Sequence, residues 1–127
     1  ILLVTFAKKY SRLMRELILS DIFYDYYQAL PERVKEKFDY VMQILISQQI
    51  VSTKFIKHIE NTKLYEMRVS VSHNEYRTLI FSLDNENLNN ASKIVLLNAF
   101  LKKSTKDYKS QIRIAENIIK ENNYEEQ

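Results

Sequence analysis

Two arginines, Arg68 and Arg77, have the type and spacing to bind an anion. They lie in two stretches, 65–71 and 76–83, that read as consecutive β-strands. Alternate side chains of a strand share one face of the sheet, and this pattern puts both arginines on the same face. Two guanidinium groups held close together on a rigid sheet repel each other, so an anion between them would explain the pair. A phosphodiester fits, because its oxygens match the planar fork of arginine donors.

The expected strand pairing sets the distance between the two arginines. A four-residue turn, 72–75, puts Ser70 opposite Arg77 and Arg68 opposite Leu79. The arginines are then diagonal neighbours on one face, roughly 7–8 Å apart.

Composition excludes several other kinds of chemistry. The chain has no cysteine and no glycine, so thiolate chemistry and the glycine-rich loops of nucleotide-binding sites are both excluded. Its two histidines, His58 and His73, fall in an expected loop and turn, and they do not suggest a metal site. The formal net charge of +3 permits a nucleic-acid partner without requiring one. No stretch approaches the ~20 apolar residues of a membrane-spanning helix. We therefore expect a cytoplasmic protein with no metal, no cofactor and no membrane partner.

The elements that must position the arginines follow from the apolar periodicity. Helical spacing predicts a hairpin of two helices around Pro31, the first capped by Ser20 or Asp21. A third strand is expected at 93–101, after a basic connector at 50–63. Its continuously apolar centre is typical of a strand covered on both faces.

The two ends of the chain complete the expected fold. A last helix is expected to begin with Thr105 or Asp107 as its cap. Near the start, the apolar pattern allows either a helix over 10–18 or a strand over 15–20. We predict an α+β fold in which an antiparallel sheet of three to four strands packs against an N-terminal helical hairpin, with a C-terminal helix.

This order of elements occurs together with three short motifs, at 64–68 (LYEMR), 75–77 (EYR) and 100–105 (FLKKST). The combination resembles the RelE/ParE toxin superfamily, and it is closest to the HigB-like branch of type II toxin–antitoxin systems. The resemblance favours the strand over 15–20. It implies a RelE-like toxin domain at 14–120 and an N-terminal extension at 1–13. The polar tail at 121–127 is expected to be frayed, as chain ends often are.

The resemblance also implies an activity and a set of partners. Such toxins are ribosome-dependent endoribonucleases that cut mRNA without a metal ion and inhibit translation. The partner is a helix-turn-helix antitoxin, and operator DNA is contacted only through the toxin–antitoxin complex. Two alternatives stay open: a ParE-like toxin that inhibits gyrase and has no RNase activity, and an inactive module that only binds an antitoxin or DNA.

Cleavage of RNA by its own 2′-hydroxyl needs charge stabilisation at the phosphate, a base and an acid. Arg68 and Arg77 match the superfamily's strand arginines, and we assign them to the phosphate; the simpler alternative is that Arg68 pairs with Glu66. Glu66 acts either as the base or as the group that orients Arg68. Tyr108 either donates a proton, stacks on a base or packs at the start of the last helix.

Lysines supply the remaining candidates. Lys102 and Lys103 match a lysine pair of the superfamily, and one of the two should face the cleft; otherwise both belong to a solvated strand end. The connector is a place where the superfamily has RNA-contacting lysines, which contribute salt-sensitive affinity. The expected RNA contacts are Lys57, Lys63, Lys106 and Phe100.

Overall fold

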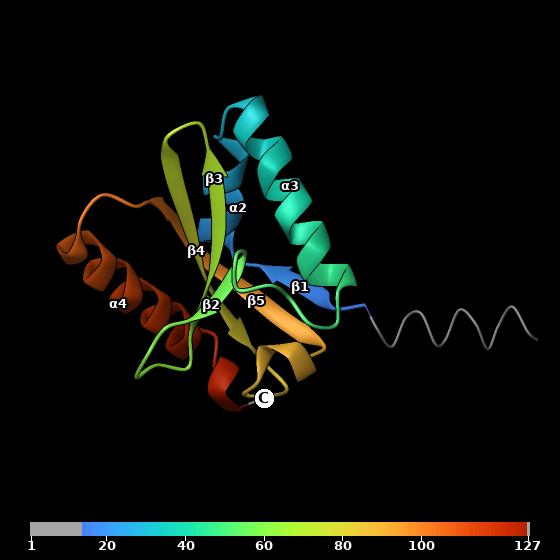
Figure 1. Cartoon of the computed structure of the whole chain (residues 1–127). Coiled ribbons are helices and arrows are strands. Elements are labelled where there is room, and N and C mark those ends of the chain that lie inside the picture. The colour runs from blue at the N-terminus through green and yellow to red at the C-terminus, as the bar shows by residue number, and fades with distance from the viewer. Residues whose placement is uncertain (1–13, 127) are drawn as a thin grey trace, which may run out of the picture.

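A computed structural model describes residues 14–126 of the chain, and the predicted extension at 1–13 lies outside the described residues. The described part is an α+β fold in which a five-stranded mixed sheet lies between helices (Figure 1). In chain order its elements are β1 (Glu16–Leu19), α2 (Asp21–Gln28), α3 (Glu32–Ser47), β2 (Ile56–His58), β3 (Tyr65–Val71), β4 (Asn74–Ser82), a 3-10 turn (Leu88–Asn90), β5 (Lys93–Leu101), α4 (Thr105–Glu121) and a last 3-10 turn (Tyr124–Glu126).

The sheet has the strand order β1-β5-β4-β3-β2, in which β1 runs parallel to β5 and the other neighbours are antiparallel. The prediction of three to four antiparallel strands is therefore met in part. The three strands placed by the sequence are present as β3, β4 and β5, and with β2 they make four antiparallel strands. The parallel strand β1 is a fifth, so β1 and β2 are added to the three strands placed by the sequence. Both added strands are short, with four residues in β1 and three in β2, and segments of this length barely show an alternating pattern. The strand alternative near the start of the chain is confirmed by β1.

Helices cover both faces of the sheet. On one face, α2 contacts β5 and α3 contacts β3; on the other face, α4 contacts β4 and β5 (Figure 1). The helical hairpin exists, but it follows β1 and so does not begin the domain. Each face has its own apolar core, one with Phe38 and Met67 and one with Leu79 and Ile118. The central strand β5 is buried from Ile94 to Phe100, as its continuous apolar sequence predicts.

Helix starts agree with the sequence only in part. Ser20 caps α2, because its hydroxyl oxygen accepts the N–H of Phe23 at 3.0 Å. Pro31 separates the two helices as expected and lies at the N-cap position of α3, one residue before the helix begins at Glu32. For α4, both expected caps are wrong. The extended backbone of Ser104 lets its hydroxyl accept the N–H of Asp107 at 3.2 Å, and this satisfies a donor that the first turn leaves free.

The turn between β3 and β4 differs from the expected one. Val71 pairs with Asn74, so only Ser72 and His73 connect the strands. Two-residue hairpin turns need a positive φ, and Ser72 supplies it with a φ of 56°. Neither glycine nor asparagine marks this position in the sequence, which explains why a longer turn was expected.

Candidate functional site

The short turn changes how the two arginines face each other. Arg68 on β3 and Arg77 on β4 lie directly opposite in the register, not as diagonal neighbours. The expectation that they share a face is confirmed, and it is the face that α4 covers (Figure 1). Directly opposed residues have Cα atoms only about 4.5–5.5 Å apart. The repulsion between the two charges is therefore stronger than the expected pairing implied, and something must compensate it.

Glu66 provides that compensation. Its Oε1 accepts a hydrogen bond from Nε of Arg68 at 3.0 Å, and its Oε2 lies 3.8 Å from Nε of Arg77. The Glu66 side chain is only 8% exposed. One carboxylate thus faces two guanidinium groups, so the three side chains together carry one net positive charge. This group of Glu66, Arg68, Arg77 and Tyr108 is called the arginine cluster below.

The two arginines differ in their access to solvent. The Arg77 side chain is 6% exposed, its Nη1 donates to the carbonyl of Tyr76 at 3.0 Å, and its Nε has no hydrogen-bond partner. The Arg68 side chain is 29% exposed. A buried guanidinium adds positive charge to the site without touching a ligand, whereas a partly exposed one can contact a ligand directly. Arg68 is therefore the arginine that an incoming phosphate can contact directly.

Tyr108 reaches the arginine cluster from the first half of α4. Its hydroxyl donates a hydrogen bond to Oε2 of Glu66, and its ring packs edge-on against Phe100, with 5.5 Å between ring centroids. Burial raises the pKa of Tyr108, and the bond to Glu66 and the Glu66 charge raise it further. At neutral pH the phenol is therefore a donor and not a base. Phe100 is buried, and its contact with the Tyr108 ring holds that ring in place.

The structure brings some of the predicted lysines to the arginine cluster. Lys57 pairs with Glu66 in the register of β2 and β3, so it flanks the cluster on one side. The N–H of Lys102 donates to the carbonyl of Glu75 at 2.8 Å, which continues the β4–β5 ladder by one pair and brings Lys102 to the side of Arg77. Lys103 lies after the end of β5, in the short link to α4. All these lysines are exposed, as is Lys106 in the first turn of α4.

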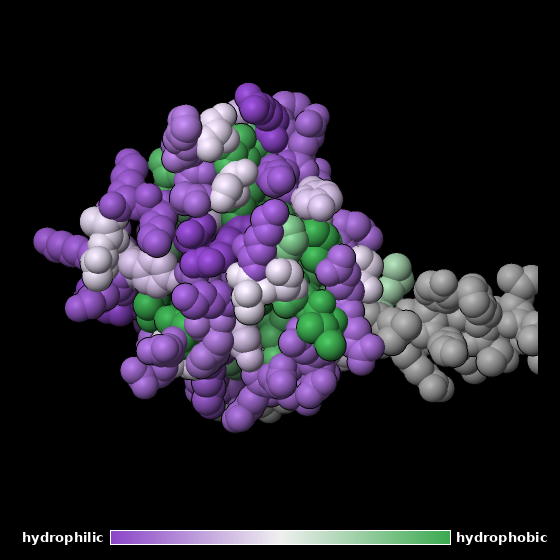
Figure 2. Space-filling model, in the orientation of Figure 1, coloured by the Kyte–Doolittle hydropathy of each residue, from purple (hydrophilic) through white to green (hydrophobic). Residues whose placement is uncertain are grey.

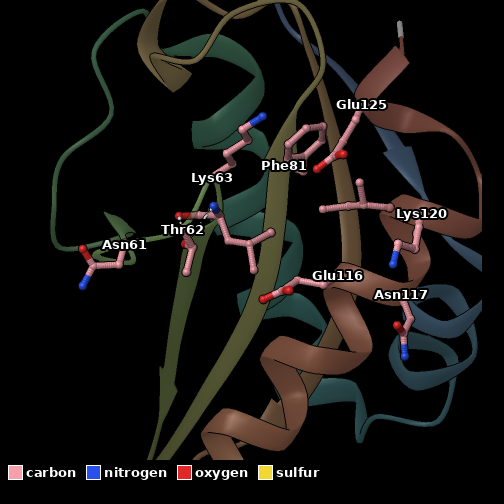
Figure 3. Close-up of a pocket in the computed structure, with 10 residues that line it drawn as sticks. Asn61, Thr62, Lys63, Phe81, Glu116, Asn117, Lys120 and Glu125 are labelled. Carbon is pink, nitrogen blue, oxygen red and sulfur yellow. Dashed lines mark hydrogen bonds between the residues drawn. The ribbon is translucent and has the colours of Figure 1, made fainter.

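Lys63 lies elsewhere. It lines a hollow of about 360 Å³ between the β2–β3 loop and the C-terminal half of α4, where Glu116 and Lys120 also lie (Figure 3). Tyr108 lies near the other end of the same helix. Lys63 is thus separated from the arginine cluster. Within residues 14–126, no group of three or more histidine, aspartate or glutamate residues could hold a metal ion.

Alkaline titration tests the environment of Tyr108 and of Tyr27, whose pKa is raised to about 12, chiefly by its hydrogen bond to Asp39. The folded chain keeps these two protons above pH ~10, where unfolded tyrosines lose theirs. We therefore expect the free energy of unfolding to be unaffected below pH ~10 and to fall as the pH rises above it. Phenolate absorbance should show a late-ionising fraction, and Tyr108→Phe should remove part of it. A single ordinary transition for all tyrosines would contradict this geometry.

Comparison with known proteins places the chain in a family. Residues 25–120 match the model of the family described as Phage derived protein Gp49-like (DUF891). The match spans 96 of the 127 residues, and the chain belongs to this Gp49-like family. It covers the whole arginine cluster, whereas β1 lies before it. No curated protein matches the chain at a significant level. Within residues 14–126, no helix is both long enough and apolar enough to cross a membrane.

Proposed function

We propose that the chain is the toxin of a type II toxin–antitoxin system and that it cleaves mRNA at the ribosome as a metal-independent endoribonuclease. The arginine cluster carries this proposal, because one buried carboxylate orients two arginines and a protonated tyrosine on one face of the sheet. Membership of the Gp49-like family, which is associated with RelE-like toxins, supports the toxin setting. A helix-turn-helix antitoxin is the proposed partner.

In the proposed reaction, the 2′-hydroxyl of a ribose gives its proton to solvent water, its oxygen attacks the adjacent phosphorus, and the bond to the 5′-oxygen breaks. The products are a cyclic phosphate and a 5′-hydroxyl. Arg68 contacts the phosphate oxygens, and Arg77 adds positive charge from its buried position. Charge that develops on the phosphate is stabilised by donors already in place, which is the largest contribution in many enzymes.

The other side chains have supporting roles in this proposal. Glu66 is a positioning residue, since both of its carboxylate oxygens are engaged by the side chains that it orients. Tyr108 keeps its proton at neutral pH. When the 5′-oxygen leaves, the Tyr108 hydroxyl breaks its hydrogen bond to Glu66 and gives this proton to that oxygen, and the phenolate then regains a proton from water. Lys57 and Lys102, exposed on either side, contact the flanking phosphates. Their contribution should weaken as salt rises, because phosphate contacts release counterions.

Mapping of RNA ends after induction tests the proposed function. We expect expression in a bacterial host to arrest growth and to produce discrete new 5′ ends within mRNA. These ends should carry a hydroxyl, so their ligation should require prior phosphorylation by a kinase. Primer extension in the same cells with the Arg68→Ala variant is the control. DNA damage without new RNA ends would indicate gyrase inhibition instead, and unaffected growth would indicate an inactive binding module.

A further inference from the structure

A second pair of polar side chains lies next to the arginine cluster on the same face of the sheet. Ser70 lies two residues after Arg68 on β3, and Glu75 lies two residues before Arg77 on β4. Ser70 and Glu75 are directly opposite each other in the register of the two strands. Because alternate residues of a strand share a face, both side chains lie on the side of the sheet that carries the two arginines.

Glu75 has one carboxylate oxygen available to a ligand. Its Oε2 accepts a hydrogen bond from the hydroxyl of Ser70. Its Oε1 makes no hydrogen bond or ion pair with any residue between 14 and 126. Both residues are exposed, because the tip of the β3–β4 hairpin extends beyond α4 (Figure 1). In the same orientation, Figure 2 shows strongly hydrophilic side chains at the centre of this side of the molecule.

The order of side chains along the two strands separates two kinds of proton-transfer group. On this face the register gives three successive rows: Glu66 opposite Leu79, then the two arginines, then Ser70 opposite Glu75. Neighbouring rows are two residues apart, which is roughly 6.6–6.8 Å along a strand. The hydroxyl of Tyr108 binds Glu66. The proton donor of the proposed reaction and the Glu75 carboxylate therefore lie on opposite sides of the arginine pair.

This arrangement suits the geometry of displacement at phosphorus, in which the attacking and leaving oxygens lie roughly in line. With the phosphate at Arg68 and the leaving 5′-oxygen toward Tyr108, the attacking 2′-oxygen lies toward Glu75. A reacting oxygen starts roughly 3–3.5 Å from its target, and a base must come within about 2.6–3.2 Å of that oxygen. A base for the 2′-hydroxyl thus lies about 6–7 Å from phosphorus, and one row of the sheet spans this distance.

The charge of Glu75 does not make the site repel a phosphate. The backbone N–H of Lys102 donates to the carbonyl of Glu75 at 2.8 Å, so Lys102 is its neighbour across the strands. Both side chains are exposed, and together they carry no net charge. The arginine cluster therefore keeps its one net positive charge for the phosphate, while Glu75 stays negative and able to accept a proton.

We propose that Glu75 is the general base of the cleavage reaction. The inference rests on the proposed function, and it names the group through which the proton of the 2′-hydroxyl passes on its way to solvent water. Oε1 of Glu75 takes this proton while the 2′-oxygen bonds to phosphorus. The electron pair of the broken bond leaves on the 5′-oxygen, which Tyr108 protonates. The neutral Glu75 then releases its proton to water, as its exposed position allows. Ser70 is a positioning residue, since its hydroxyl holds the other oxygen of Glu75.

The test compares two substrates in single-turnover cleavage by the full chain on programmed ribosomes. One is an ordinary mRNA, and the other has sulfur in place of the 5′-oxygen at the cleaved bond. A thiolate leaves without being protonated, so Tyr108→Phe should be slow on the ordinary mRNA and regain most of its rate on the sulfur substrate. Glu75→Gln keeps the size of the side chain but removes the base. We expect it to lower the rate constant by about 10²-fold or more on both substrates, with no loss of affinity for the programmed ribosome.

Chemical rescue gives an independent measurement. Glu75→Ala leaves room for a small carboxylate, so added formate should raise its rate constant by about 10-fold or more and leave Tyr108→Phe unaffected. Glu116→Gln is the matched control, because Glu116 is an exposed carboxylate in the hollow at the C-terminal half of α4. It should cleave both substrates at the wild-type rate. Circular dichroism checks that each variant is folded.

The outcomes separate this inference from the proposed function. If the wild type cleaves and Glu75→Gln cleaves at the same rate, or if formate does not raise the rate of Glu75→Ala, the assignment is wrong and the proposed function stands. Recovery of Glu75→Gln on the sulfur substrate would mean that Glu75 acts on the leaving group, which also contradicts the assignment. If the wild type cleaves neither mRNA, both proposals fall together.

Discussion

Arg68→Ala should relieve growth arrest and slow mRNA cleavage by about 10²–10³-fold, the usual effect of removing one donor that stabilises charge in a transition state. The chain should still fold, because the Arg68 side chain is partly exposed and its removal leaves Glu66 bound to Tyr108 and next to Arg77. Cleavage can be measured by single-turnover kinetics on programmed ribosomes, and folding by circular dichroism. A loss of cleavage without a loss of structure is the expected result.

Arg77→Ala should have a similar effect on cleavage but should also cost stability. Its guanidinium is buried beside Glu66, and truncation leaves that carboxylate with less compensation inside the protein. Arg113→Ala on α4 is a control for the loss of one positive charge, because Arg113 is exposed on the helix. It should leave cleavage within a few-fold of the wild type. A doubly substituted Arg68→Ala/Arg77→Ala chain that stays fully toxic would rule out any role of the pair in cleavage.

Much of the site could be predicted because it rests on strand alternation. The strands 65–71 and 93–101 agree with β3 and β5, and alternation alone places Glu66 and Arg68 on one face. What sequence reasoning missed is the opposition of Arg68 and Arg77, because the register depends on a turn that only the positive φ of Ser72 defines. Shifting the pairing by two positions keeps the face but changes the neighbours.

The contact between Tyr108 and Glu66 shows a second limit of prediction from sequence, which is the position of a helix on the sheet. Forty-two residues separate them in the chain, and their hydrogen bond depends on where α4 crosses the sheet. The buried amide of Asn98 on β5 donates to the carbonyl and to the side chain of Gln111, at 3.1 and 2.9 Å, and so ties α4 to the sheet one turn after Tyr108. The sequence offers a signal for this contact only in hindsight: an asparagine within an otherwise apolar central strand.

Arg15 is the residue that sequence reasoning overlooked altogether, although it is buried. It lies just before β1, and its guanidinium donates five hydrogen bonds to backbone carbonyls. Three are those of Leu45, Gln48 and Gln49 at the end of α3, and two are those of Asn89 and Ala91 before β5. The last carbonyls of a helix have no partner within it. Arg15 thus caps the C-terminal end of α3 and joins this end to the loop that leads into the central strand β5.

Arg15→Met should lower the free energy of unfolding by about 3–5 kcal/mol, as expected when one partner of a buried charged network is removed. Methionine keeps the apolar stem but leaves five carbonyls without their donor, so the loss comes from polar groups and not from a cavity. Urea denaturation followed by circular dichroism measures this loss of stability.

Glu16→Gln, at the exposed neighbouring position, is the control and should change the free energy of unfolding by less than about 0.5 kcal/mol. Because a bound ligand can hide a stability loss, the measurement should use the chain without a partner. An unchanged urea midpoint for Arg15→Met would mean that water replaces the guanidinium at no cost, and that α3 is held by its apolar face alone.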